Sequence, residues 1–214
     1  MLLWHGSSKI IKSPQYGAGN PHNDYGPGFY CTESEEMAKE WACADKENGF
    51  ANCYELEMAG LKICNLGDKS YGILSWMALL VNNRLLTNTS SIGKAGADFL
   101  IKYYLPDISE FDVIIGKRAD DSYFTFARAF LNNTISLRQL SEAMELGDLG
   151  EQIVIKSEKA FEHLIFIKYE EAHCDKYYYD RIARDKKARS DYVVLSGTVD
   201  IDGVFIRDLM RERI

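Results

Sequence analysis

Proline is scarce in this chain, with four residues in 214, and no stretch rich in proline and serine interrupts it. Such stretches commonly form linkers between domains. Hydrophobic residues make up 46% and charged residues 27%, the usual balance of a globular protein. We therefore predict a single domain over residues 1–214, with a charged helical part from about residue 170 to the end.

Paired cysteines are also missing. No CxxC pair and no cluster of cysteine and histidine occurs among the five cysteines, which are Cys31, Cys43, Cys53, Cys64 and Cys174. This spacing predicts neither a zinc site nor a disulfide framework, so we expect no metal cofactor and reduced thiols. The N-terminus lacks a basic region followed by a long apolar core, which argues against a signal peptide. We expect a cytoplasmic protein.

The chain has neither a surplus of basic residues nor a long apolar run. Its formal net charge of -7 disfavours non-specific nucleic-acid binding, because such binding depends on neutralised phosphates. A nucleic-acid substrate held by a local patch is still allowed. The longest apolar stretch, residues 73–81, is too short to span a bilayer and predicts a buried helix. We expect no membrane partner.

Short strands are predicted to alternate irregularly with helices, which favours an α+β fold. Residues 6–26 are rich in glycine, asparagine, proline and serine and predict a long loop, a kind of segment that is often functional. Thr32 with Glu35, and Ser136 with Gln139, have the spacing of helix capping boxes. Strands are expected at residues 1–5, 29–31, 53–58, 62–65, 111–116, 152–155 and 164–168, and helices after Thr32, at 71–86, 94–104 and 122–131, after Ser136, and at 157–163, 170–192 and 204–214.

Two motifs near the N-terminus are the most informative part of the sequence. Residues 4–7 read WHGS at the end of a short apolar run, and residues 23–32 read NDYGPGFYCT just before the first predicted helix. A histidine at a strand end is more often structural, and a Gly-x-Gly-Phe-Tyr segment also fits a simple turn into a strand. Both motifs in this order, followed by a capped helix, nevertheless favour a functional site.

These motifs resemble the nicotinamide pocket of ADP-ribosyltransferases. The resemblance implies that His5 hydrogen-bonds the adenine-side ribose, that the Gly6 backbone binds the carboxamide beside the Ser7 hydroxyl, and that Tyr30 covers the nicotinamide ring. By analogy Tyr25 is a second aromatic wall. The second motif also assigns Asn23 and Gly28 to the cofactor site.

Cleavage of NAD⁺ at the nicotinamide bond is similar to glycoside cleavage, because the ribose becomes oxocarbenium-like. Nicotinamide leaves as a neutral molecule, so the leaving nitrogen requires no general acid. The reaction needs groups that bind the nicotinamide ring and its carboxamide, and groups that stabilise the developing cation electrostatically. Glycine allows close backbone approach, and an aromatic face stacks on the ring.

Two pairs of residues are candidates for the catalytic polar group. Glu151 and Gln152 begin a predicted strand that resembles the last motif of poly-ADP-ribosyltransferases, where an ungapped match places Glu151 at the catalytic position. A shift of one residue reverses the face of a strand, so the alternation does not choose between the two. Asp120 and Asp121 are paired carboxylates that could hold a ribose or activate an acceptor, whereas one of them could instead cap the following helix.

The first 170 residues or so are most similar to a bacterial family of uncharacterised ADP-ribosyltransferase-like proteins of toxin type. The supporting landmarks, besides the two motifs, are residues 112–116 (DVIIG), 119–121 (ADD), Gln152 and 157–160 (SEKA). The resemblance implies a split β-sandwich of two small antiparallel sheets surrounded by helices. It also implies NAD⁺ as substrate without a metal, a small antitoxin protein as partner, and an acceptor that is either protein or nucleic acid. The alternatives are an NAD glycohydrolase and a catalytically silent module that binds a nucleotide or a partner.

Overall fold

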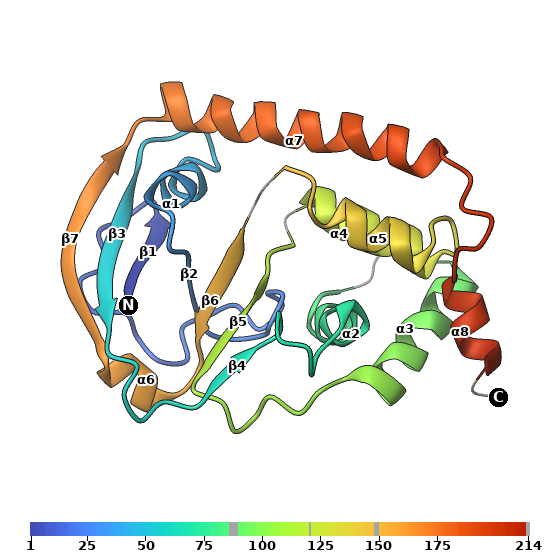
Figure 1. Cartoon of the computed structure of the whole chain (residues 1–214). Coiled ribbons are helices and arrows are strands. Elements are labelled where there is room, and N and C mark those ends of the chain that lie inside the picture. Colours follow the sequence, from blue (N-terminus) through green and yellow to red (C-terminus); the bar gives the residue numbers. More distant parts are fainter. Residues whose placement is uncertain (86–89, 120, 148–149, 213–214) are drawn as a thin grey trace. The chain divides into compact units, whose positions relative to one another are not determined.

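The computed structural model describes residues 1–85, 90–119, 121–147 and 150–212. The chain forms two compact units that alternate along the sequence (Figure 1). The first unit comprises residues 1–65, 107–116 and 151–184, and the second comprises residues 66–106, 117–150 and 185–214. Helices and two small sheets are present, so the predicted α+β class is confirmed.

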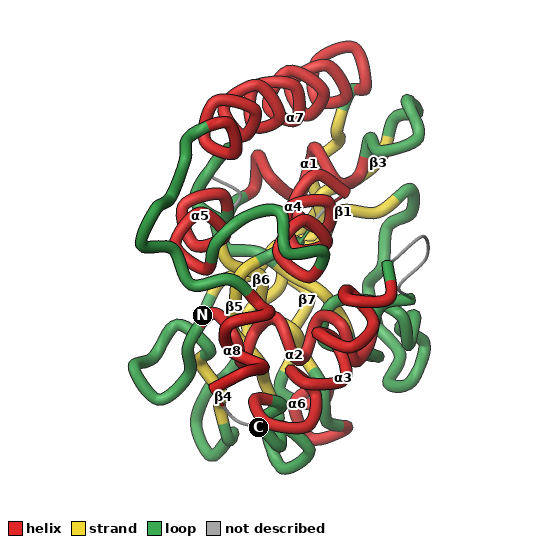
Figure 2. The backbone as a smooth tube through the Cα atoms, turned by 90° about the vertical axis from the view of Figure 1, so that its right-hand side faces the viewer, coloured by secondary structure: helices red, strands yellow, loops and turns green. Residues whose placement is uncertain are grey.

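The strands of the described residues form two sheets, and Figure 2 draws these strands in yellow. In the first sheet β1 (Leu2–Ser7), β3 (Gly49–Leu56) and β7 (Leu164–Ala172) lie in this order and are antiparallel. The second has the order β2 (Phe29–Cys31), β6 (Glu151–Ile155), β5 (Val113–Lys117) and β4 (Ile63–Asn65). The pairing of β4 with β5 is parallel, unlike the antiparallel arrangement expected. It is parallel because the long connection between them, through α2 (Ile73–Asn83) and α3 (Ser91–Tyr104), returns the chain to the same end.

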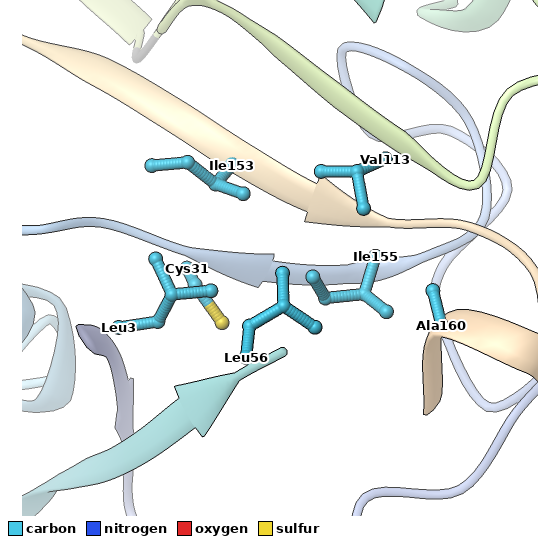
Figure 3. Packing of buried hydrophobic residues seen from close by; sticks show 7 residues of the cluster. All are labelled: Leu3, Cys31, Leu56, Val113, Ile153, Ile155 and Ala160. Atoms are coloured by element: carbon cyan, nitrogen blue, oxygen red, sulfur yellow. The ribbon is translucent and has the colours of Figure 1, made fainter. Parts of the chain in front are cut away.

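One hydrophobic cluster joins the two sheets. Leu3 and Leu56 of the first sheet meet Cys31, Ile153 and Ile155 of the second, and each is at most 2% exposed (Figure 3). Cys31 pairs with Ile153 across β2 and β6, so the two side chains leave the same face of that sheet. Burial of each large aliphatic side chain contributes about 1.5–3 kcal/mol. This cluster holds β2 close to β1.

A backbone bridge also connects β1 to the residue after β2. The Trp4 N–H donates to the Thr32 carbonyl at 2.7 Å, and the Thr32 N–H donates to the Trp4 carbonyl at 2.9 Å. The Thr32 hydroxyl accepts from the Ser34 N–H at 3.2 Å, before the helix begins, so the prediction that Thr32 caps the helix is wrong. The cap is Ser34, whose hydroxyl accepts from the Met37 N–H at 3.2 Å, and α1 spans Glu35–Ala42.

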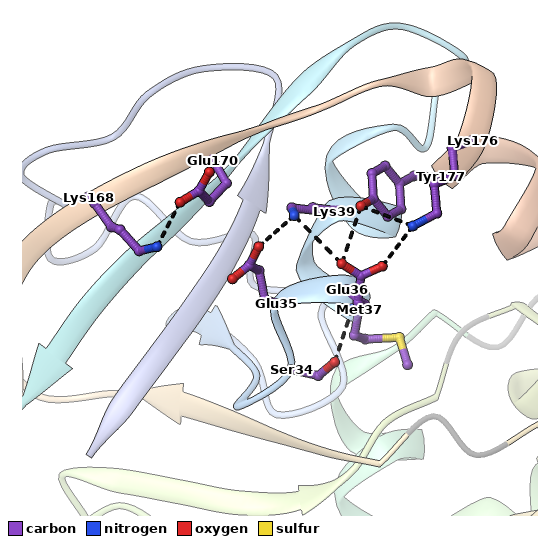
Figure 4. Close-up of polar contacts among 9 residues, drawn as sticks. All are labelled: Ser34, Glu35, Glu36, Met37, Lys39, Lys168, Glu170, Lys176 and Tyr177. Carbon is purple, nitrogen blue, oxygen red and sulfur yellow. Dashed lines mark hydrogen bonds and ion pairs between the residues drawn. The ribbon is translucent and has the colours of Figure 1, made fainter.

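The helix α1 contacts β1 on one side and α7 (Cys174–Gly197) on the other. On the β1 side the helix passes directly over Gly6, where a Cβ atom would overlap the Ala38 carbonyl oxygen. On the α7 side the Glu36 carboxylate accepts from Lys176 Nζ at 3.1 Å and from the Tyr177 hydroxyl at 3.2 Å (Figure 4). These contacts hold α1 against the part of β1 that carries the WHGS motif.

The strand β7 is longer than the sequence predicts, and α7 begins later. Residues 170–172 were expected to be helical, but Glu170 and Glu171 pair with Ala51 and Phe50 of β3, and Ala172 is fully buried. Backbone pairing with a central strand outweighs the helical preference of a Glu-Glu-Ala segment. The short helix α6 (Glu158–Glu162) precedes β7, with Ser157 as its cap.

The second unit is helical and contains α2, α3, α4 (Asp121–Leu131), α5 (Leu137–Ala143) and α8 (Ile206–Glu212). The predicted capping box of Ser136 and Gln139 is present at the start of α5. No helix in the described part of the chain is long and apolar enough to cross a membrane. The core contains side chains that are at most 1% exposed, including Met77, Leu80, Leu100, Phe126 and Phe130.

Candidate functional site

A cavity of about 440 Å³ lies in the first unit, where β1, the start of β2 and the loop between them meet. Four of the predicted cofactor-binding residues line it, namely His5, Asn23, Gly28 and Tyr30. The other lining residues are Phe29 at the start of β2 and six residues of the loop, which are Ile11, Ser13, Pro14, Gln15, Ala18 and Gly19. The two N-terminal motifs therefore meet at one cavity, and the long loop between them forms one of its walls.

The imidazole of His5 is oriented by the backbone of Tyr30. His5 Nδ1 lies 2.7 Å from the Tyr30 carbonyl oxygen, which only accepts, so Nδ1 carries the hydrogen and Nε2 is the acceptor of the neutral ring. The Phe29 ring lies against the imidazole, with centroids 4.2 Å apart and a tilt of 30°. Burial lowers the pKa of His5, although the bond to Tyr30 opposes this shift. His5 is thus a neutral hydrogen-bond acceptor at pH 7.

The lowered pKa of His5 predicts a dependence of stability on pH. The folded protein disfavours the imidazolium, whereas in the unfolded chain the pKa returns to its ordinary value of 6.5. The unfolded state then binds more protons, and His5 should reduce the free energy of unfolding as the pH falls below 6.5. Urea unfolding at pH 7.5 and 5.5 should show that the free energy of unfolding falls less between the two pH values in His5→Gln than in the wild type. Equal losses in the two proteins would contradict the burial of His5.

Tyr30 closes the turn that leads into β2. Its hydroxyl donates to the Gly26 carbonyl at 2.6 Å and accepts from the Tyr25 N–H at 3.0 Å. Gly26 has a φ of 75°, which explains the need for glycine at this position. The Tyr25 side chain, predicted as a second aromatic wall, is 1% exposed and is not among the lining residues. Of the two tyrosines, only Tyr30 lines the cavity.

Gly28 lets three segments of the chain come close together. A Cβ at Gly28 would lie 2.6 Å from Val154 Cγ1 of β6, and a Cβ at Gly19 would lie 2.5 Å from the Gly28 nitrogen. Beside them, Lys156 Nζ donates to the Tyr25 carbonyl at 2.6 Å. Burial lowers the pKa of Lys156. The Gly-x-Gly motif thus packs the turn between β6 and the loop.

Gly6 and Ser7, at the end of β1, are not among the residues that line the cavity. Gly6 pairs with Ala51 of β3 and provides the close approach of α1. The Ser7 hydroxyl accepts from the Lys9 N–H at 3.2 Å, which starts the turn into the loop. Both residues shape the strand next to His5.

Asn52 and Tyr54 of β3 hold the loop, and no motif drew attention to them. Asn52 is fully buried and lies opposite His5, and its Oδ1 accepts from the Ile11 N–H at 2.9 Å. Its Nδ2 lies within 3.2–3.4 Å of three backbone carbonyl oxygens, including those of His5 and Lys9. The Tyr54 hydroxyl donates to the Ile11 carbonyl. A single asparagine in an apolar strand is the only sequence signal for this contact.

The alternation of β6 settles which of Glu151 and Gln152 lies on the Tyr30 face. Val154 pairs with Tyr30, so Gln152 shares that face, and it is 4% exposed. Gln152 Nε2 donates to Asp24 Oδ2 at 2.9 Å, and the Asp24 side chain is itself buried. Glu151 is exposed, and neither it nor Gln152 is a lining residue.

Of the second predicted pair, Asp120 lies outside the described residues. Asp121 is the first residue of α4, in the second unit. The buried Asp24 was not singled out as a candidate, although it stands inside the NDYGPGFYCT motif, directly after the lining residue Asn23.

The cavity and the residues that shape it lie in the first 166 positions of the chain. The model of a family described as "Protein of unknown function (DUF3990)" matches residues 1–166. The chain belongs to this family. Neither the curated proteins nor the solved structures gave a match. The family description names no activity, so the chemistry of the cavity carries the functional argument.

Proposed function

We propose that the protein is an NAD⁺-dependent ADP-ribosyltransferase of toxin type, which cleaves the nicotinamide–ribose bond and transfers ADP-ribose to a macromolecule. One observation carries this proposal: His5 and Tyr30, from separate motifs, line the same cavity, and the His5 imidazole donates a hydrogen bond to the backbone carbonyl of Tyr30. The resemblance to the nicotinamide pocket of ADP-ribosyltransferases requires these two residues to meet.

The lining residues suit the nicotinamide end of NAD⁺. Phe29 offers aromatic surface for the ring, Tyr30 borders the same cavity, and the amide side chains of Asn23 and Gln15 offer donors and acceptors for a carboxamide. Nε2 of neutral His5 accepts a hydrogen bond from a ribose hydroxyl. The leaving group needs no proton, so these groups have only to bind and orient it.

The developing positive charge on the ribose needs a negative partner. Asp24 is the nearest candidate along the chain, because it directly follows the lining residue Asn23; its buried carboxylate does not line the cavity itself and would act on the ribose through space. Gln152 donates to that carboxylate and restricts its orientation. We assign the electrostatic stabilisation to Asp24 and the positioning of its carboxylate to Gln152.

The transferase proposal is tested with NAD⁺ labelled in its adenosine half. A lysate treated with the wild-type protein should acquire macromolecular label, and removal of the label by protease or by nuclease identifies the acceptor. His5→Ala and Tyr30→Ala should each lower the labelling rate at least about 100-fold, because they remove contacts to the reacting end. Circular dichroism checks that both fold, and Tyr179→Ala, an exposed tyrosine of α7, is the matched control. Full labelling by both cavity variants would end the assignment.

An NAD glycohydrolase is the second candidate. The loop residues that form one wall of the cavity favour it, because a ribose covered on that side is reached more easily by water than by a macromolecular acceptor. Rapid release of nicotinamide from NAD⁺ by the purified protein, with no label in the lysate, would support hydrolysis. Binding of NAD⁺ without turnover would instead indicate a silent binding module.

A further inference from the structure

The cavity lacks the charge that a dinucleotide needs. At about 440 Å³ it falls in the lower part of the usual range for ligand sites, about 300–1,000 Å³. None of its described lining residues is a lysine, arginine, aspartate or glutamate. A ligand with two nucleosides and a diphosphate therefore has to extend past the lining residues, with its phosphates near a cation outside them.

Tyr16 is an aromatic side chain at the border of the cavity. It lies in the loop between the lining residues Gln15 and Ala18, at a turn where Gly17 has a φ of 80°. Its side chain is 58% exposed, and its ring meets Phe161 of α6 edge-on, with centroids 5.8 Å apart. The edge contact orients the ring while leaving much of its surface open, as a stacking platform for a base requires.

Lys12 supplies a cation next to the same wall. It is exposed and stands between the lining residues Ile11 and Ser13, and the backbone of Ile11 is fixed by Asn52 and Tyr54. All 32 acidic residues of the chain lie after position 23, so the first part of the loop carries no acidic residue. Within the described residues no carboxylate pairs with Lys12, in contrast to other lysines such as Lys62.

We propose that Lys12 and Tyr16 form a subsite for an ADP group, in which Tyr16 stacks on the adenine and Lys12 pairs with the diphosphate. The inference rests on the proposed function, because it assigns the second half of the same dinucleotide. The cavity takes the nicotinamide end, with His5 beside the adenine-side ribose, and the loop takes the adenine and the diphosphate. The loop thereby selects a dinucleotide over a free nucleoside.

Binding of ADP, measured by isothermal titration calorimetry, tests the subsite without any turnover. Wild-type protein should bind ADP, and Tyr16→Ala should weaken that binding about tenfold, as expected for the loss of one stacked base. Tyr16→Phe should keep the affinity because it keeps the ring. Lys12→Ala should weaken binding and reduce its dependence on salt. Tyr179→Ala, a change of a similarly exposed tyrosine on α7, should have no effect.

The test of the ADP subsite can succeed or fail independently of the test of transferase activity. If NAD⁺ is cleaved, Tyr16→Ala should raise KM for NAD⁺ with little change in kcat, and should leave cleavage of nicotinamide riboside unchanged. If NAD⁺ is not cleaved, loss of ADP binding in Tyr16→Ala still supports the subsite. Equal ADP affinity in Tyr16→Ala and wild type, or no ADP binding by wild type, would overturn it. Tyr16-dependent binding of single-stranded RNA that ADP does not displace would overturn it as well.

Discussion

Replacing Gly6 with alanine is expected to lower the free energy of unfolding by at least about 3 kcal/mol. The new Cβ would overlap the Ala38 carbonyl oxygen and would lie 2.8 Å from the Ala42 nitrogen. Both atoms belong to the backbone of α1, so no side-chain rotation relieves the clash. The helix has to move away from β1, and urea unfolding followed by circular dichroism measures the loss.

Gly197→Ala is the matched control for this change. Gly197 ends α7, and a Cβ there meets no atom within 4 Å. Its free energy of unfolding should stay within about 0.5 kcal/mol of the wild type or rise slightly. A Gly6→Ala protein as stable as this control would show that α1 does not pack on β1 as described.

Replacing Asn52 with leucine is expected to cost about 3 kcal/mol of stability and to disrupt the cavity. Leucine is similar in size, but it leaves the Ile11 N–H without its acceptor and the Lys9 carbonyl without a donor. Each buried polar group that loses its partner costs about 1–3 kcal/mol. Because Ile11 lines the cavity, the proposed function also predicts a higher KM for NAD⁺. Urea unfolding and steady-state kinetics measure the two effects.

An aspartate at the same position gives a result that separates hydrogen bonding from packing. Asn52→Asp keeps an acceptor for Ile11 but directs a carboxylate at the backbone carbonyls of His5 and Lys9. Burial should raise the pKa of the new carboxyl, so the variant should regain stability as the pH falls and the group becomes protonated.

Asn82→Leu, at an exposed position of α2, is the control for Asn52→Leu and should change stability by no more than about 0.5 kcal/mol. An equal loss in Asn82→Leu and Asn52→Leu would contradict the role of Asn52.

Most of the fold could be predicted from local patterns. The apolar residues 153–155 and the run after Phe111 indicated strands, and the spacing of Ser136 and Gln139 indicated a capped helix. These signals are local, so they are visible without tertiary contacts. The errors occurred where a distant strand competes with a local preference. The backbone of Thr32 pairs with Trp4, and the backbone of residues 170–172 pairs with β3.

The site could be predicted only in part, for a similar reason. His5 and Tyr30 stand in motifs, whereas Asn52 acts through hydrogen bonds to residues more than 40 positions away. The choice between Glu151 and Gln152 depended on strand register, which the pairing of Val154 with Tyr30 supplies. Asp24 stands within a motif, but its burial and its bond to Gln152 arise only from tertiary contacts.

The central claim is that one cavity, between His5 and Tyr30, binds the nicotinamide end of NAD⁺. The most direct measurement is the release of nicotinamide from NAD⁺, followed by liquid chromatography, with the purified protein in the presence of lysate. We predict steady release by the wild type and by Tyr179→Ala, and release at least about 100-fold slower by His5→Ala and by Tyr30→Ala. The same rate in all four proteins, or no release together with no NAD⁺ binding at millimolar concentration, would contradict the claim.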